Sequence, residues 1–103
     1  MQENEIITAI REHLSKAAPG ARAFLYGSRA RGTAKEDSDW DVLILLDKPK
    51  VTFEDHSRIV YPLEIIGFKM NQEINPMLCT EEYWRQSSFT PFHHNVSKDC
   101  IAI

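Results

Sequence analysis

The chain has 103 residues, 43% of them hydrophobic and 26% charged, and a formal net charge of −3. This length allows one hydrophobic core, so we treat residues 1–103 as a single domain. The negative charge argues against strong general nucleic-acid binding, which normally shows as an excess of basic residues. Because no apolar run approaches a membrane span and the acidic N-terminus is unlike a signal peptide, we expect a cytoplasmic protein without a membrane segment.

The first half of the chain predicts one helix and two strands. Apolar residues recur at helical spacing over residues 4–17, which predicts an amphipathic helix. A short apolar run, residues 23–26, predicts the first strand over residues 22–26. The second strand is predicted over residues 42–46, where the sequence is apolar enough to be buried on both faces of a sheet.

A second long helix is predicted after these strands. Thr52 suits its N-cap, because Asp55 follows three residues later and can accept from backbone donors there. Pro62 lies inside the apolar stripe that follows and lacks a backbone donor, which predicts a kink or a late helix start. Gly67 comes directly after the stripe and is expected to end the helix.

The last third of the chain predicts a strand and two short helices. The strand is expected over residues 71–79, at an edge of the sheet or with a bulge, because Pro76 cannot donate to a ladder. Thr80 and Thr90 each precede residues typical of a helix start. The apolar segment 101–103 is expected to dock on the domain or to meet a partner.

The turn after the first strand carries the first chemical signal. Gly27 has no side chain, so the backbone there can approach a ligand closely. Ser28 adds a hydroxyl, and residues 28–31 can form a helical turn that presents backbone N–H groups. This combination is suited to binding phosphate oxygens, although a Gly-Ser turn by itself is usually only a turn.

The start of the second strand carries the second signal. Asp39 and Asp41 are two residues apart and therefore point to the same face of a strand, about 6 to 7 Å apart along the chain. Two neighbouring carboxylates repel each other, and a hard cation such as Mg²⁺ between them makes the arrangement favourable. An Asp-x-Asp pair alone is more often solvated, but a phosphate-binding turn beside a metal site is what nucleotidyl transfer requires.

The runs Gly-Ser-Arg-Ala-Arg-Gly (27–32) and Ser-Asp-Trp-Asp (38–41) together resemble the motif of the minimal nucleotidyltransferase domains of the DNA polymerase beta-like superfamily. The resemblance implies a small α/β (α+β) domain with helices packed on a mixed sheet. It also implies that Gly27, Ser28 and Ser38 lie at the nucleotide and that Asp39 and Asp41 are metal ligands. In this family two divalent ions and a nucleoside triphosphate are typically bound.

The resemblance implies a third carboxylate on the strand predicted over residues 71–79. The position expected from the family falls near Asn75, whose amide cannot supply the charge. Glu73 is the only acid of that strand and, two residues earlier, lies on the same face. We therefore name Glu73 as third ligand or general base, with a solvent-facing glutamate as the alternative.

Basic and aromatic residues near these motifs have more than one interpretation. Arg29 and Arg31 can neutralise phosphate charge, or they can pair with the nearby acids Glu36 and Asp37. His93 and its neighbour His94 project to different sides of a helix and are expected to face solvent.

Two functions remain open from the sequence. The first is an enzyme that transfers a nucleoside monophosphate, AMP from ATP or the equivalent from another triphosphate, to an acceptor. The resemblance suggests a helical HEPN-type protein as partner, as in toxin and antitoxin pairs in which the nucleotidyltransferase modifies the toxin. The second is a non-catalytic module that binds nucleotide or docks on a partner, and the third acid discriminates between them.

Overall fold

The computed structural model describes residues 3–103, with side chains from residue 5 onward. The first two residues of the polar N-terminus, which entered the expectation about signal peptides, lie outside the described residues. One sheet runs through the molecule in the order β3-β2-β1-β4. Its strands are β1 (Arg22–Tyr26), β2 (Trp40–Leu46), β3 (Ile74–Thr80) and β4 (Ile101–Ala102). The β2–β3 pair is parallel, and β1 is antiparallel to β2 and to β4, so the predicted mixed sheet is confirmed.

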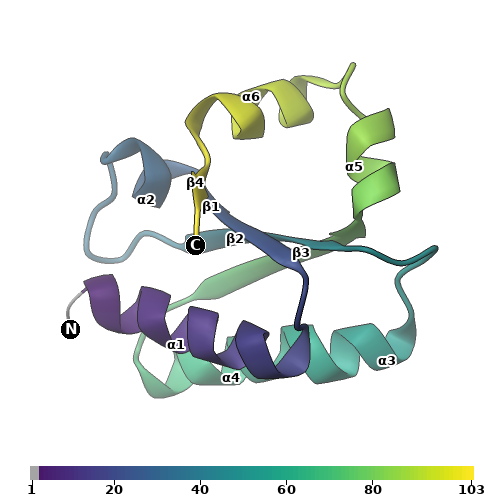
Figure 1. The fold of residues 1–103 in the computed structure, drawn as a ribbon. Helices are drawn as coiled ribbons and strands as arrows, with labels where there is room; N and C mark the ends of the chain where they lie inside the picture. Colours follow the sequence, from purple (N-terminus) through teal and green to yellow (C-terminus); the bar gives the residue numbers. More distant parts are fainter. Residues whose placement is uncertain (1–2) are drawn as a thin grey trace.

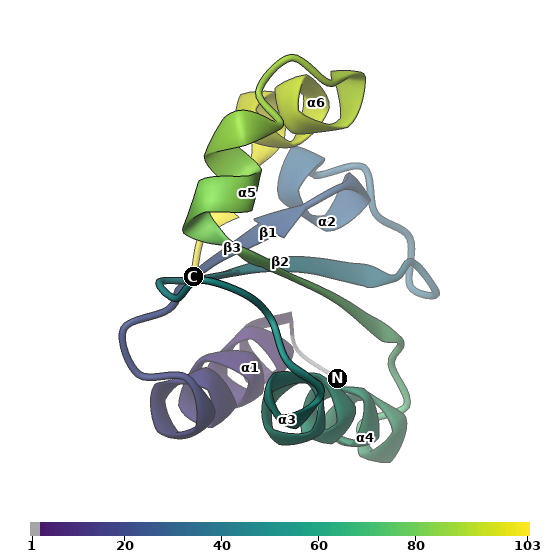
Figure 2. The ribbon, with the colours of Figure 1, turned by 90° about the vertical axis from the view of Figure 1, so that its right-hand side faces the viewer.

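Helices cover both faces of this sheet (Figures 1 and 2). Below it lie α1 (Glu3–Ala17) and a continuous helical segment made of α3 (Phe53–Asp55), the π-helical turn η1 (His56–Val60) and α4 (Tyr61–Lys69). Above it lie α2 (Ser28–Arg31), α5 (Glu81–Gln86) and α6 (Pro91–Asp99). No helix in the part of the chain that the structure describes is both long and apolar enough to cross a membrane.

Strand β2 is buried on both faces, as its sequence predicts, and joins two cores. Alternate side chains of a strand point to opposite faces. Trp40, Val42 and Ile44 therefore pack into the larger core with α1 and α4. Leu43 and Leu45 pack on the other side, in a smaller cluster that includes residues of α6. The residues of β2 thus tie the two helical layers to one sheet.

The irregularity predicted at Pro62 takes the form of the π-helical turn η1, which ends two residues before the proline. Pro62 cannot donate to the carbonyl of Arg58, four residues earlier, so this carbonyl is free of the usual α-helical bond. A wider turn at this point accommodates the missing bond without ending the helix. The Thr52 N-cap and its reciprocal bond with Asp55 are present as predicted.

The prediction that Gly67 ends the second long helix is wrong. Helix α4 continues to Lys69, and the chain turns at Asn71, which has a φ of 57°. Gly67 is buried inside the helix. A β-carbon at this position would lie 2.9 Å from the carbonyl oxygen of Gln72 and 2.9 Å from Cγ1 of Ile74, so no larger residue fits without a shift. This glycine therefore permits close packing of α4 against the start of β3.

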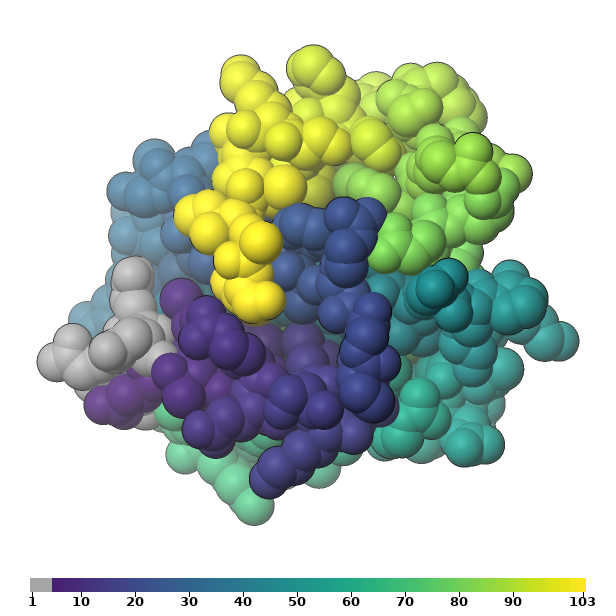
Figure 3. All heavy atoms as spheres, in the orientation of Figure 1, coloured from purple at the N-terminus to yellow at the C-terminus, as the bar shows by residue number. Residues whose placement is uncertain are grey.

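The other C-terminal elements follow the sequence patterns. Strand β3 lies at the edge of the sheet, where Pro76 is tolerated, and it begins later than expected because the preceding residues form the turn after α4. Thr80 and Thr90 cap α5 and α6 through their hydroxyl oxygens. The C-terminal segment docks on the domain: β4 pairs with β1, and Figure 3 shows this yellow segment lying against β1.

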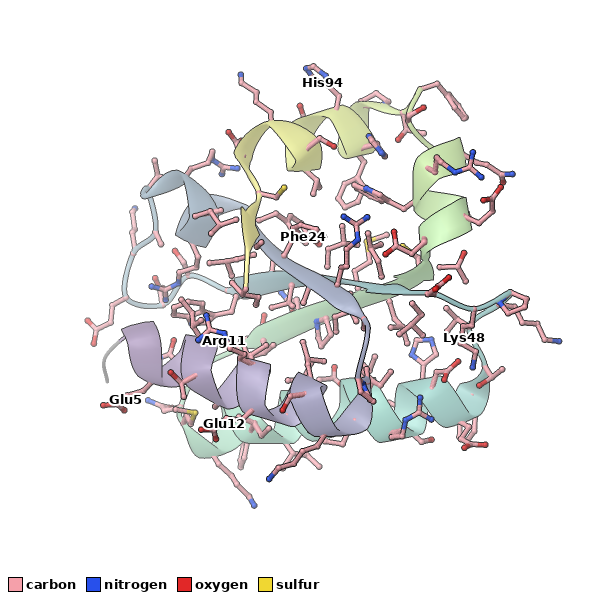
Figure 4. The ribbon with its side chains drawn as sticks, in the orientation of Figure 1. Glu5, Arg11, Glu12, Phe24, Lys48 and His94 are labelled. Atoms are coloured by element: carbon pink, nitrogen blue, oxygen red, sulfur yellow. The ribbon has the colours of Figure 1, made fainter. Side chains whose placement is uncertain are left out.

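A buried ion network holds the start of α3 at the end of β2. The Asp55 carboxylate is only 1% exposed and accepts hydrogen bonds from Lys48 Nζ at 2.8 Å and Arg58 at 3.0 Å. The backbone N–H of Thr52 donates to the same carboxylate at 2.9 Å. The bond from Lys48, which Figure 4 labels near α3, is the main reason that the pKa of Asp55 is held well below its usual range.

Asp55→Asn is expected to lower the free energy of unfolding by about 3 kcal/mol, because it leaves two cations without their buried partner. Since the folded-state pKa is depressed, this contribution is complete above the unfolded pKa of about 3.9 and is lost as pH falls below it. Urea denaturation at several pH values measures the effect, with the neighbouring, exposed Glu54→Gln as control. A difference between wild type and Asp55→Asn that stays constant down to acid pH would contradict this account.

Candidate active site

The parallel pairing of β2 and β3 brings the predicted acidic residues together. The register aligns Asp41 with Asn75. A hydrogen bond of 2.8 Å from the Trp40 N–H to the Glu73 carbonyl continues the ladder, so Asp39 lies next to Glu73. Because residues two apart share a face, the four polar side chains of these two pairs are on the side of the sheet that carries α2, α5 and α6.

The electrostatics of this group are those of crowded carboxylates. Burial raises the pKa of Asp41; a hydrogen bond from Asn75 and the charge of Arg31 lower it in part, while the charge of Asp39 raises it further. Hydrogen bonding to Asp39 and the charge of that residue raise the pKa of Glu73, which is fully exposed. The Asn75 amide donates to Asp39 Oδ2 at 2.9 Å. The site therefore stabilises the ionised acids incompletely, and this favours the binding of a cation beside them.

Gly27 is required here by the acidic pair itself. Its φ of 75° and ψ of −157° belong to a region that side-chain-bearing residues rarely adopt. A β-carbon at Gly27 would lie 2.5 Å from Oδ2 of Asp41. The missing side chain thus makes room for the carboxylate of Asp41. From the sequence, Gly27 is expected to allow close approach of the backbone to phosphate, and that role of Gly27 and of Ser28, the first residue of α2, stays a prediction.

Arg29 binds the backbone of the loop that leads to β2. Its guanidinium carbon lies 4.3 Å from the centre of the Trp40 ring, and Nη2 donates to the carbonyls of Glu36 at 3.2 Å and Ser38 at 2.9 Å. It therefore contacts Glu36 through the backbone carbonyl. These contacts fix the loop before Asp39, and nucleotide contact by Arg29 stays a prediction.

Arg31 and Ser38 have partners of their own. Nη1 of Arg31 lies 3.9 Å from the Asp99 carboxylate, and its charge also lowers the pKa of Asp41, so Arg31 is beside the acidic pair. The hydroxyl of Ser38 accepts from the backbone N–H of Lys35 at 2.8 Å, which closes the loop before β2. This hydroxyl keeps its own proton for a further acceptor.

Three features of this face were missed from the sequence. Tyr26 is the neighbour of Asp41 on β1, and burial together with the charge of Asp41 raises its pKa. Asn75, considered only as a missing acid, is a hydrogen-bond donor to Asp39. His93 is stacked on Trp84 with 4.2 Å between ring centres, so the expectation that it faces solvent is wrong, whereas His94 is exposed at the outer side of α6 (Figure 4). The sequence signal that could have identified Tyr26 is the antiparallel register, which places it opposite Asp41 once β1 and β2 are paired.

The donor set fits one magnesium ion. Mg²⁺ is usually held by one or two carboxylates and completed by water and substrate phosphates, and Asp39 and Asp41 supply two carboxylates on one face. Among the side chains that the structure describes, those of residues 5–103, there is no group of three or more His, Cys, Asp or Glu arranged to hold a metal ion. The assignment of Glu73 as a third ligand therefore stays a prediction.

Comparison with known proteins identifies the family. The profile of the nucleotidyltransferase domain matches residues 5–88. The chain belongs to this family. A solved structure described as a candidate minimal nucleotidyltransferase superposes with a TM-score of 0.68 at 24% identity, over 100% of this chain and 97% of that one. A toxin-antitoxin crystal structure with AMP-PNP superposes with a TM-score of 0.63 at 16% identity, over 98% of this chain and 72% of that one.

No curated protein sequence matches this chain. The two structural likenesses establish the fold of a minimal nucleotidyltransferase, in agreement with the mixed sheet predicted above. Membership in the nucleotidyltransferase family indicates an enzyme.

Gly27→Ala is expected to lower the free energy of unfolding by about 3 kcal/mol, because it combines backbone strain with a clash at Asp41. Gly32→Ala is the control for a positive φ alone: Gly32 has a φ of 80° and a ψ of 16°, in the left-handed region that is less strained than the conformation of Gly27, and a β-carbon there would meet nothing within 4 Å. Strain alone predicts a loss of about 1 kcal/mol for this control. Equal losses for the two variants in urea denaturation would show that the contact with Asp41 is unimportant.

Proposed function

We propose that the protein is a metal-dependent nucleotidyltransferase that transfers AMP from ATP, or the equivalent group from another triphosphate, to an acceptor. The observation that carries this proposal is the pair Asp39, directly before β2, and Asp41, on β2, with the Gly27 turn packed against Asp41. The match of the nucleotidyltransferase profile to residues 5–88 supports it independently. We propose the cytoplasm as the location, where the nucleotide is available.

The proposed roles follow from the positions of the side chains. Asp39 and Asp41 bind Mg²⁺, which when bound neutralises phosphate charge and polarises the phosphorus that is attacked. The turn at Gly27 and Ser28 orients the triphosphate, and Arg31 adds positive charge beside it. An acceptor hydroxyl oxygen forms a bond to the α-phosphorus, the bond to pyrophosphate breaks, and Glu73 takes the proton of the hydroxyl or serves as a further metal ligand.

We propose a partner protein as acceptor, of the helical HEPN type. The likeness to a toxin-antitoxin structure with AMP-PNP supports a protein partner for this chain. Exposed aromatic side chains around α5 and α6 support it as well: Tyr83 is 60% exposed, Phe89 86% and Phe92 42%. Clustered exposed apolar groups commonly mark an interface.

A non-catalytic module that binds nucleotide or docks on a partner is the second candidate. The specific observation in its favour is Asn75, an amide in the register position beside Asp41, together with the full exposure of Glu73. With a two-carboxylate set, binding of one ion with nucleotide is expected, whereas the two-ion arrangement needs a further acid.

The variant Asp39→Asn plus Asp41→Asn is expected to weaken Mg²⁺-dependent ATP binding at least about tenfold, because it removes both charges from the site. Isothermal titration calorimetry with and without Mg²⁺ measures this. Asp37→Asn plus Asp47→Asn is the matched control, since it removes the same charge from exposed positions outside the pair. Equal affinity of the double variant and wild type would refute the proposed metal site.

Catalysis is tested by mixing the protein with the product of the adjacent gene, ATP and Mg²⁺ and searching for a nucleotide adduct by mass spectrometry. We expect an adduct whose rate of formation falls about a hundredfold in Glu73→Gln, because proton transfer commonly contributes this much. Glu12→Gln, exposed on α1 on the opposite side of the sheet, is the control. A stable complex that forms no adduct with any divalent ion would favour the docking module.

A further inference from the structure

One neutral side chain lies among the acids of the candidate site. The Nδ2 of Asn75 donates to Oδ2 of Asp39 at 2.9 Å. The strand register also places Asn75 opposite Asp41. The amide thus lies between two carboxylates, and the two N–H bonds of an asparagine allow it to donate to more than one acceptor.

The backbone explains why this amide is well placed. Asn75 is the second residue of β3, and the ladder fixes it opposite Asp41. Asp39 differs, because it precedes β2 and lies just outside the strand register. Repulsion from Asp41 favours turning the Asp39 carboxylate away, and a donor on the neighbouring strand opposes this. Hydrogen bonds to an ionised acceptor are stronger than neutral ones, so a single amide is sufficient to hold the Asp39 carboxylate in place.

We propose that Asn75 is a positioning residue that holds Asp39 beside Asp41, so that a divalent cation meets two carboxylates already oriented. This inference rests on the proposed metal-dependent function and adds a residue to it. Asn75 acts through Asp39 and makes no contact with the reacting atoms. Its effect is therefore greatest on cation binding in the absence of nucleotide, where no phosphate helps to organise the site.

The test compares Asn75→Ala with wild type in the binding of Mn²⁺ alone, followed by electron paramagnetic resonance of the free ion. We expect the dissociation constant to rise about tenfold, the loss of one hydrogen bond to a charged group. Thermal melting with EDTA present is expected to change little, since the side chain of Asn75 is exposed. Asn95→Ala, exposed on α6, is the control and is expected to bind as wild type does.

A second measurement needs no metal. The side-chain amide signals of Asn75, assigned by their absence from the ¹H–¹⁵N spectrum of Asn75→Ala, are expected to move upfield in Asp39→Ala as the hydrogen bond is lost. Unchanged signals would overturn the proposal. So would equal Mn²⁺ affinity of Asn75→Ala and wild type, which leaves the proposed function intact. If wild type binds Mn²⁺ no better than Asp39→Asn plus Asp41→Asn, the metal site fails, and the role of Asn75 fails with it.

Discussion

The parallel pairing of β2 with β3 is the constraint on which both the core and the candidate site depend. At one end of the pair the register aligns Asp41 with Asn75, and along its length it aligns the apolar residues that join the two cores. Side chains alternate along a strand, so a slip of one residue would exchange the two faces. It would move Asp41 into the core below the sheet and expose Ile44 to the opposite layer. Burial of the apolar residues therefore fixes the position of the acids.

Two aspartates show how burial and hydrogen bonding set the pKa of a carboxylate at different places in this fold. Asp55 is buried, but the bonds from Lys48 and Thr52, with a smaller contribution from Arg58, outweigh the cost of burial, and its pKa falls. At Asp41, burial outweighs the bond from Asn75 and the charge of Arg31, and its pKa rises. The first aspartate is satisfied by the chain itself and stabilises the fold. The second is incompletely compensated, which is typical of a site that receives a charged ligand.

Local patterns in the sequence were enough for most elements, because helix caps, proline positions and apolar periodicity act over a few residues. The Thr52 cap and the edge position of the strand with Pro76 are examples. What could not be predicted depends on contacts between distant segments. Gly67 looks like a helix end until β3 packs on it, and Gly27 looks like a phosphate turn until Asp41 fills the space beside it. The Asn75–Asp39 bond joins residues 36 positions apart, which no local pattern encodes.

In the proposed function, the charges of Asp39 and Glu73 couple binding of the cation to binding of the nucleotide. Asp39 disfavours ionisation of Glu73, so the site as it stands repels a further negative charge such as a triphosphate. A divalent cation held by Asp39 and Asp41 would neutralise these two carboxylates and so remove most of this repulsion. Binding of nucleotide without a cation is thus opposed by the same acids that favour binding of the two together. This coupling arises from charge alone, so it holds for a catalyst and for a docking module, and only the fate of the acceptor proton at Glu73 separates them.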